Sequence, residues 1–211
     1  MYVNRIIQEE IIRKLEPNKV VVLYGPRQVG KTTLVEHILE EIGEDHLYLS
    51  GENRDVRGWL SSQSLEILKQ HIGPYRLVVI DEAQKVEAIG VNLKLLVDHI
   101  KGIRILATGS SSFALSHQLG EPLVGRQRQF FLFPFAQMEL DHLEKPHERQ
   151  ARLPMRMIYG GYPEAVIQDN AEDKRAFLNG MVDSYLFRDL LELCVHGRSL
   201  PIRWLIMPGH P

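Results

Sequence analysis

Two glycines, a lysine and a threonine at fixed spacing are the residues of this sequence with the clearest chemistry. Gly25, Gly30, Lys31 and Thr32 match the pattern G-x-x-x-x-G-K-[ST] within VVLYGPRQVGKTTL, residues 21–34. Glycines let a loop wrap an anion with its backbone N–H groups, because they adopt backbone angles that side chains resist. A lysine and a hydroxyl at the end of such a loop suit the phosphates of a nucleotide and a Mg²⁺ ion. The spacing therefore predicts a phosphate-binding loop.

The residues between and around these glycines complete the candidate loop. Pro26 fixes φ and stiffens the loop, and the helix that begins near Lys31 directs its positive end at the phosphates. We expect Lys31 to reach the β- and γ-phosphates, and the Thr32 hydroxyl to coordinate Mg²⁺. A chance strand-turn-helix is the alternative, but an apolar strand precedes the loop and a helix follows it, as a phosphate loop requires. The nucleotide-binding candidates are Gly25, Pro26, Arg27, Gln28, Val29, Gly30, Lys31, Thr32 and Thr33.

Two adjacent carboxylates, Asp81 and Glu82, follow the apolar residues of LVVIDEAQ, residues 77–84. Open α/β sheets bind ligands in the crevice at the carboxyl ends of their strands, where the chain turns and both side chains can face the ligand. We expect Asp81 to bind Mg²⁺ through water, and Glu82 to polarise the water that attacks a γ-phosphate. An acidic loop beside a core strand is the plain alternative. A second acid next to the magnesium acid favours hydrolysis over simple phosphate binding.

Polar residues near two other strands are further catalytic candidates. Thr108 ends the apolar run IRILAT and is expected to contact the γ-phosphate or the water, with Ser110 as second choice. A turn that caps the next helix is the alternative. Arg126 and Arg128 precede the apolar run QFFLF. Arg126 could stabilise charge on a transferred phosphoryl group, in the same chain or across a subunit interface, although a solvated basic edge fits these arginines equally well.

The composition excludes several kinds of protein. The 211 residues carry a net charge of −2 with histidine neutral, so no overall positive field favours DNA. The single cysteine, Cys194, excludes an intrachain disulfide framework and a cysteine-rich metal site. No stretch approaches the roughly 18 apolar residues that span a bilayer, and the charged N-terminus is unlike a signal peptide. We therefore expect a cytoplasmic protein with no membrane partner.

Apolar strands alternate with helices along the first two thirds of the chain. Continuous apolar strands separated by helices are typical of a parallel sheet that is covered on both faces. Helices are expected at 3–15, 32–41, 64–71 and 91–100, and strands at 20–24, 46–49, 76–81, 103–108 and 129–133.

After Pro134 the pattern becomes helical, at about residues 136–159 and then 171–192. We predict three parts from this change. They are a sheet domain with its N-terminal helix over 1–134, a helical lid subdomain over 135–193, and a divergent or truncated tail over 194–211.

Six motifs occur along the chain in an order that resembles a known family. They are GPRQVGKTTL, VVIDEAQKV, ILATGSSSFAL, GRQRQFFLFPFAQME, GGYPEAV and SYLFRDLLEL. The chain closely resembles the prokaryotic AAA-type P-loop ATPases, whose core is typically followed by a C-terminal domain of uncharacterised function. The resemblance covers about residues 4–193. It implies an α/β fold of the P-loop NTPase (ASCE/AAA) type, with a parallel sheet, helices on both faces and a small C-terminal helical subdomain.

The resemblance also implies a ligand and a further contact. It points to ATP with Mg²⁺ rather than GTP, since no N/T-K-x-D guanine-reading motif occurs. The GGYP stretch, residues 160–163, is similar to a Gly-x-Pro element whose proline packs near the adenine. Pro163 is therefore a candidate nucleotide contact and Tyr162 a weaker one, while a helix stop followed by a turn is the alternative.

The match to the family fails after about Leu193. Members normally continue into a second domain of comparable size, whereas this sequence continues with CVHGRSLPIRWLIMPGHP. A frameshifted or truncated product is one hypothesis. A natural short form, whose apolar residues 204–207 need a partner, is the other.

Three functions fit these observations. The first is a Mg²⁺-dependent ATPase that binds ATP and ADP and couples its nucleotide state to an unknown protein partner or to the missing domain. The second is a nucleotide-gated switch with little turnover. The third is a DNA-associated ATPase, which the net charge does not support. A role for Arg126 across a subunit interface would require an oligomer.

Overall fold

The computed structural model describes residues 2–110, 119 and 122–186. The chain divides into two compact units, Met1–Pro163 and Glu164–Pro211. The predicted tail over 194–211 lies outside the described residues. Within the part of the chain that is described, no helix combines the length and the apolar character needed to cross a membrane.

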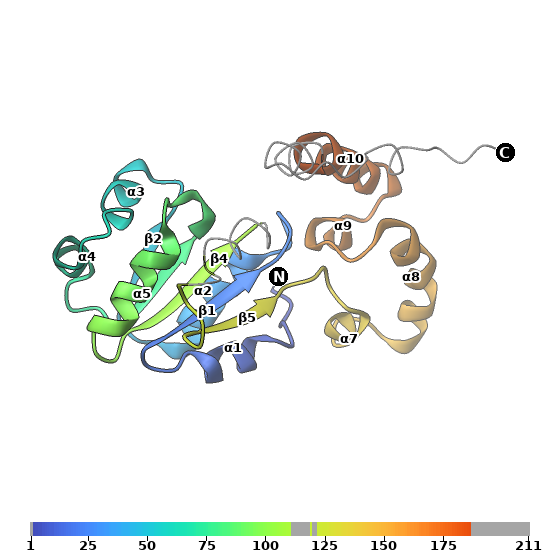
Figure 1. Cartoon of the computed structure of the whole chain (residues 1–211). Helices are drawn as coiled ribbons and strands as arrows, with labels where there is room; N and C mark the ends of the chain where they lie inside the picture. Colours follow the sequence, from blue (N-terminus) through green and yellow to red (C-terminus); the bar gives the residue numbers. More distant parts are fainter. Residues whose placement is uncertain (1, 111–118, 120–121, 187–211) are drawn as a thin grey trace. The chain divides into compact units, whose positions relative to one another are not determined.

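A five-stranded parallel sheet is the centre of the first unit (Figure 1). Its strand order is β2-β3-β4-β1-β5, so β1 is interior and β4 lies between β1 and β3. This confirms the predicted parallel α/β sheet. The strands are β1 (Lys19–Tyr24), β2 (His46–Ser50), β3 (Leu77–Asp81), β4 (Arg104–Gly109) and β5 (Gln127–Phe131).

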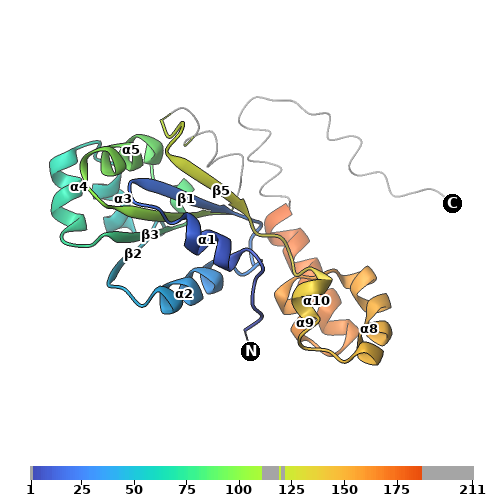
Figure 2. The same ribbon diagram turned by 90° about the horizontal axis from the view of Figure 1, so that it is seen from below.

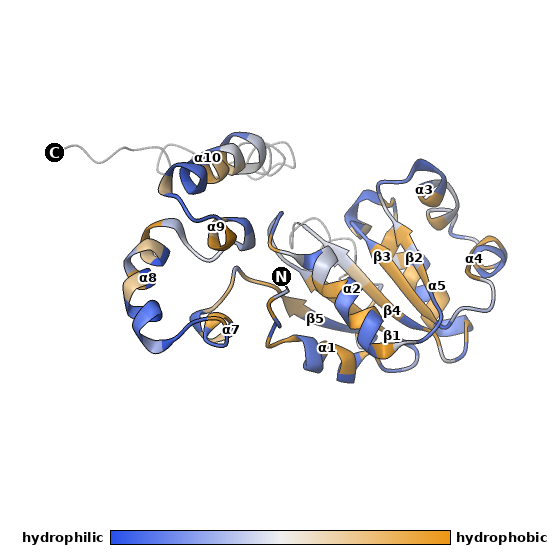
Figure 3. Ribbon diagram, turned by 180° about the vertical axis from the view of Figure 1, so that it is seen from behind, coloured by the Kyte–Doolittle hydropathy of each residue, from blue (hydrophilic) through white to orange (hydrophobic). Residues whose placement is uncertain are grey.

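Both faces of the sheet are buried, which explains why its central strands are apolar without alternation. In β1, Val20 and Val22 pack into the core on one face, whereas Val21 and Leu23 pack into the core on the other. Figure 3 shows the hydrophobic character of β1, β3 and β4 between these two layers. A strand buried on both faces has no polar side to reveal a period of two.

Helices form the two covering layers (Figure 2). Helices α1 (Gln8–Lys14) and α2 (Lys31–Ile42) pack on one face, and their buried side chains include Ile11 and Ile38. The other face is covered by α4 and α5, with Leu60 of α3 in the same core. These helices are α3 (Arg54–Leu60), α4 (Leu65–Ile72) and α5 (Ile89–His99), and the short 3₁₀ helix η1 (Ala83–Lys85) follows β3.

The helical part after β5 differs from the sequence prediction, which did not include α9 (Pro163–Ile167) and expected one helix before it. A continuous helix over 136–159 is wrong, because α7 (Gln137–Leu140) and α8 (Pro146–Tyr159) are separate. Proline disfavours the helical conformation in the residue before it, and Lys145 is extended with ψ 154°. The Glu148 carboxylate accepts a hydrogen bond from the Lys145 N–H at 2.9 Å, so a new helix begins here.

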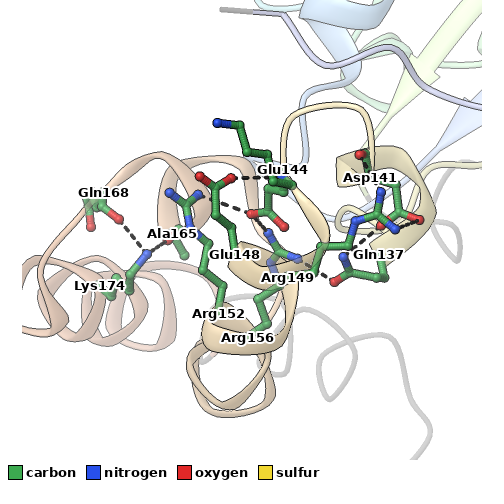
Figure 4. A network of polar contacts seen from close by, with 11 residues as sticks. Gln137, Asp141, Glu144, Glu148, Arg149, Arg152, Arg156, Ala165, Gln168 and Lys174 are labelled. Atoms are coloured by element: carbon green, nitrogen blue, oxygen red, sulfur yellow. Dashed lines mark hydrogen bonds and ion pairs between the residues drawn. The ribbon is translucent and has the colours of Figure 1, made fainter.

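Ion pairs stabilise α8 against the turn that precedes it (Figure 4). The buried carboxylate of Glu144 pairs with Arg152 at 3.2 Å and also with Arg156. The described part of the chain then continues through α9 (Pro163–Ile167), α10 (Ala171–Met181) and the π-helical turn Val182–Leu186. In the second unit, the Lys174 ammonium donates to the carbonyl of Ala165 within α9 and to that of Gln168, which follows α9.

Truncation of Ile38 should destabilise the first unit. The side chain is fully buried between α2 and the sheet, so Ile38→Ala should lower the free energy of unfolding by about 2–5 kcal/mol. The midpoint of urea denaturation measures this loss. The matched control is Ile67→Ala on α4, where the side chain is 39% exposed and the loss should be much smaller. Equal losses in the two variants would contradict the described core.

Candidate functional site

The loop between β1 and α2 is shaped by its two glycines. A Cβ atom on Gly25 would lie 2.6 Å from the carbonyl oxygen of Leu132, which is too close for any side chain. Gly30 has φ +95°, a left-handed conformation that strongly favours glycine. Val29 is buried in the core beneath α2 and anchors the loop from inside. The predicted loop therefore leaves β1 and enters α2 by a path that needs glycine at both positions.

Lys31 is the first residue of α2, and its side chain packs against the loop. Its side chain is almost wholly buried, and Nζ donates to the carbonyl oxygens of Gly25 at 2.9 Å and Pro26 at 3.0 Å. Burial lowers the pKa of this ammonium, and the charges of Glu82 and Asp81 oppose that effect. The lysine thus combines a desolvated charge with nearby carboxylates, an arrangement typical of anion-binding and catalytic sites.

A hydroxyl on each side holds the carboxylate of Asp81. The Thr32 hydroxyl donates to Oδ2 at 3.3 Å, and the Thr108 hydroxyl donates to Oδ1. Thr108 Oγ1 also accepts a hydrogen bond from the Glu82 N–H at 3.1 Å. The structure therefore brings together Thr32 from α2, Asp81 and Glu82 from the end of β3, and Thr108 from β4.

This arrangement suits a magnesium ion that takes few ligands from the protein. Among the described residues, no group of three or more histidine, cysteine, aspartate and glutamate side chains could enclose a metal. Mg²⁺ usually keeps several waters and is held by one or two protein oxygens together with substrate phosphates. The Thr32 hydroxyl and the Asp81 carboxylate provide hard oxygen ligands of that kind, so the residues present fit the ion.

Glu82 is held in a strained turn. Its φ is +51°, uncommon for a residue with a side chain. Gly51, after β2, packs so closely that an added Cβ would lie 2.3 Å from the Glu82 carbonyl oxygen, and its N–H donates to the Asp81 carbonyl at 2.7 Å. The left-handed turn breaks the strand alternation directly after Asp81, as expected if both carboxylates are to face the same crevice.

Sequence reasoning missed two residues next to these carboxylates. Gln84 donates to the Glu82 carboxylate, and Tyr48 on β2 lies near Asp81. Burial, together with the charge and hydrogen bonding of Asp81, raises the pKa of the Tyr48 phenol. The register pairs Ser50 with Asp81, so Tyr48 is the diagonal neighbour on the same face. Only the strand order reveals the place of Tyr48, whereas Gln84 stands openly in the DEAQ motif.

The structure separates Arg126 from the other predicted residues. Its carbonyl accepts the Val20 N–H at 2.9 Å, so it lies at the amino end of β1. The loop follows Tyr24 at the other end, about 13 Å further along the strand. The Arg126 guanidinium pairs with Asp98 at 2.6 Å, and Arg128 is exposed on β5. A contact between Arg126 and a phosphate on the loop of its own chain does not fit this placement, and a role across a subunit interface stays a prediction.

Pro163, by contrast, lies beside the loop. A Cβ atom on Gly30 would be 3.9 Å from Pro163 Cγ. Two residues earlier, Gly161 contacts Phe135 through the backbone, and the Phe135 N–H donates to its carbonyl at 2.7 Å. Tyr162 packs against the core on the α2 side of the sheet. The GGYP stretch is thus brought to the phosphate loop, and its contact with an adenine stays a prediction.

Comparison with known proteins agrees with this geometry. The family described as "AAA domain" matches residues 17–141, more than half of the chain. The chain therefore belongs to the AAA domain family, and its fold is that of the P-loop NTPases, which bind nucleotides.

Two curated relatives and one solved structure extend the comparison. An uncharacterised protein of Methanocaldococcus jannaschii is 27% identical over 202 residues, covering 89% of this chain and 45% of its own length. One of Mycobacterium tuberculosis is 30% identical over 192 residues, covering 90% and 40%. This chain thus spans less than half the length of these relatives. A solved chain described as "Structural Basis for Katanin Self-Assembly" aligns over 67% of this chain and 55% of its own, at 18% identity and TM-score 0.45.

Removal of the Thr108 hydroxyl should destabilise the protein without changing its shape. Thr108→Val leaves the Asp81 oxygen and the Glu82 N–H without this partner, so the free energy of unfolding should fall by about 1–3 kcal/mol. Thermal denaturation followed by circular dichroism measures the change. The matched control is Thr33→Val on the exposed side of α2, which should change stability little. A variant at Thr108 as stable as the wild type would show that the hydrogen bonds contribute little.

Proposed function

We propose that the protein is a Mg²⁺-dependent ATPase. The observation that carries this proposal is the convergence of four groups at one edge of the sheet. They are the loop with its buried lysine, the hydroxyl of Thr32, and the carboxylates of Asp81 and Glu82. A domain that only bound phosphate would need the loop and the metal ligands, but no second carboxylate held beside them.

Each group has a proposed role in the reaction. Backbone N–H groups of residues 25–32 bind the phosphates, and the Lys31 ammonium neutralises the β- and γ-phosphates. Thr32 and Asp81 would hold Mg²⁺, which when bound supplies positive charge to the phosphate oxygens. Glu82 accepts a hydrogen bond from the attacking water and orients it, and Thr108 keeps both carboxylates in place. Positioning and charge stabilisation then account for most of the rate.

Coupling to another protein or domain is part of the proposal. The relatives are more than twice the length of the segment that this chain matches, so in them the ATPase part is joined to further sequence. The nucleotide state of the ATPase part would be coupled to such a partner. If the chain assembles with copies of itself, Arg126 could act across the interface, since it lies away from the loop of its own chain. The net charge of −2 does not favour DNA as the partner.

Nucleotide binding should raise the melting temperature. At a hundredfold excess over Kd, Mg·ATP stabilises the folded state by about 2.7 kcal/mol. For a chain of this length each kcal/mol raises Tm by roughly 2–4 °C, so a rise of about 5–10 °C is expected. Lys31→Ala should abolish the rise, whereas Lys94→Ala on the exposed side of α5 should keep it. The absence of any shift at millimolar Mg·ATP in the wild type would contradict binding.

Hydrolysis should depend on Glu82. Glu82→Gln keeps the size of the side chain but removes the charge that orients the water, so kcat should fall by about 10²-fold or more. Binding of a fluorescent ATP analogue should be unchanged. Glu87→Gln, at an exposed position in the turn before α5, is the matched control and should hydrolyse ATP like the wild type.

Two results would separate the alternatives. A Glu82→Gln variant that hydrolyses ATP at the wild-type rate would remove the role assigned to Glu82. Tight Mg·ATP binding with no turnover in the wild type would instead identify the protein as a nucleotide-gated switch.

A further inference from the structure

The side chain of Gln84 connects the ends of two neighbouring strands. Gln84 lies in η1, directly after β3, and Ser110 directly follows β4. Gln84 Nε2 contacts the carboxylate oxygen Oε2 of Glu82 and lies 2.9 Å from Ser110 Oγ. Gln84 therefore bridges the proposed hydrolytic carboxylate of Glu82 and Ser110 beyond the end of β4. The DEAQ motif by itself does not predict this link.

The charge of Glu82 dictates which way the carboxamide faces. An ionised carboxylate only accepts hydrogen bonds, so the NH₂ group of Gln84, and not its oxygen, must face Glu82. This NH₂ group has two hydrogens. One can bond to Glu82 and the other to Ser110, so both donors are used.

The carbonyl oxygen of the Gln84 carboxamide is in a less favourable position than the NH₂ group. Gln84 Oε1 is buried and receives no hydrogen bond from any residue in the described ranges. A buried acceptor without a donor is unfavourable, so an apolar side chain of similar size would fill this space at lower cost. The two donated hydrogen bonds, rather than packing, explain an amide at this position.

The bridge formed by Gln84 restricts the orientation of the Glu82 side chain. The backbone of Glu82 is already fixed by the left-handed turn, the close contact of Gly51 and the hydrogen bond to Thr108. These contacts do not fix the side-chain torsions of Glu82, and a glutamate side chain can adopt several rotamers. Gln84, in η1, connects the Glu82 side chain to Ser110 beyond the end of β4, and Thr108 on β4 restrains Asp81.

We propose that Gln84 is a positioning residue for ATP hydrolysis: its carboxamide braces the Glu82 carboxylate against Ser110 so that Glu82 is aimed at the attacking water. This role rests on the proposed function. Because a misplacement of about 1 Å at a reacting group can cost on the order of 10²-fold in rate, a brace of this kind affects kcat. Within the described ranges, the side-chain hydrogen bonds of Gln84 go to Glu82 and Ser110 and not to the proposed phosphate-binding loop, so their loss should leave nucleotide affinity unchanged.

The first test separates turnover from binding with full-length variants. Gln84→Met keeps the volume and removes both donors, so kcat should fall about tenfold to hundredfold while KM and the Kd for a fluorescent ATP analogue stay constant. Ser110→Ala should give a smaller fall in kcat. The kcat of the double variant Gln84→Met/Ser110→Ala should be no lower than that of Gln84→Met, because both substitutions remove the same bridge. Gln70→Met, exposed on α4, is the matched control and should match the wild type.

The second test does not need turnover. In the nucleotide-free protein, the Gln84 side-chain NH₂ signals in a ¹H–¹⁵N NMR spectrum should exchange with water more slowly than those of the exposed Gln70. Ser110→Ala and Glu82→Gln should each shift the Gln84 signals.

These readouts distinguish failure of the brace from failure of the proposed function. Gln84 signals that exchange as fast as those of Gln70 overturn the brace, even in an active ATPase. Gln84→Met and Ser110→Ala variants that both hydrolyse at the wild-type rate overturn its role in positioning. Slow exchange in a wild-type protein without ATPase activity overturns the proposed function, and with it the role in hydrolysis, although the bridge itself exists.

Discussion

The hydroxyl of Thr108 is the contact on which the arrangement of the site depends. It donates to the Asp81 carboxylate and accepts the Glu82 N–H at 3.1 Å, so one buried group fixes two consecutive acids. This is possible only because β4 lies between β1 and β3 in a parallel sheet. The carboxyl ends of parallel strands meet at one edge, so the phosphate loop after β1 and the acids after β3 face each other across β4. The proposed chemistry follows from that strand order.

A buried charge and two residues in the left-handed conformation lie at the same edge of the sheet. Lys31 is buried against the loop carbonyls, and burial lowers the pKa of its ammonium while the nearby acids oppose that effect. Gln28 and Glu82 have φ values of +59° and +51°, a left-handed conformation that costs energy for residues with side chains. Proteins retain such conformations where surrounding contacts impose them, often at functional sites. Packing against Gly51 and the core therefore stabilises a site that would not form as an isolated peptide.

Much of the fold could be predicted because the sheet is buried on both faces. Continuous apolar runs identified β1, β3 and β4, and the alternation with helices indicated the parallel arrangement. The strands expected at 46–49 and 129–133 overlap β2 and β5, although β5 begins two residues earlier than predicted. Several local features escaped, among them the short elements α3, η1 and α9 and the break between α7 and α8. Helix α3 is short and largely polar, so its period is weak, although Asn53 caps it through two backbone N–H groups. The break between α7 and α8 depends on the conformation that Pro146 imposes on the residue before it, which a search for helical periodicity overlooks.

The amino-acid order alone predicts a phosphate-binding loop and a pair of acids, because glycine, lysine and carboxylate chemistry is local to each motif. Tertiary packing decided the rest. Arg126 precedes β5, but the parallel register places it at the amino edge, away from the loop. Tyr48 and Ser110 acquire their neighbours only once β2, β3 and β4 lie side by side. Side chains distant in sequence meet through strand order and register, and hydrophobic burial of the whole sheet sets both.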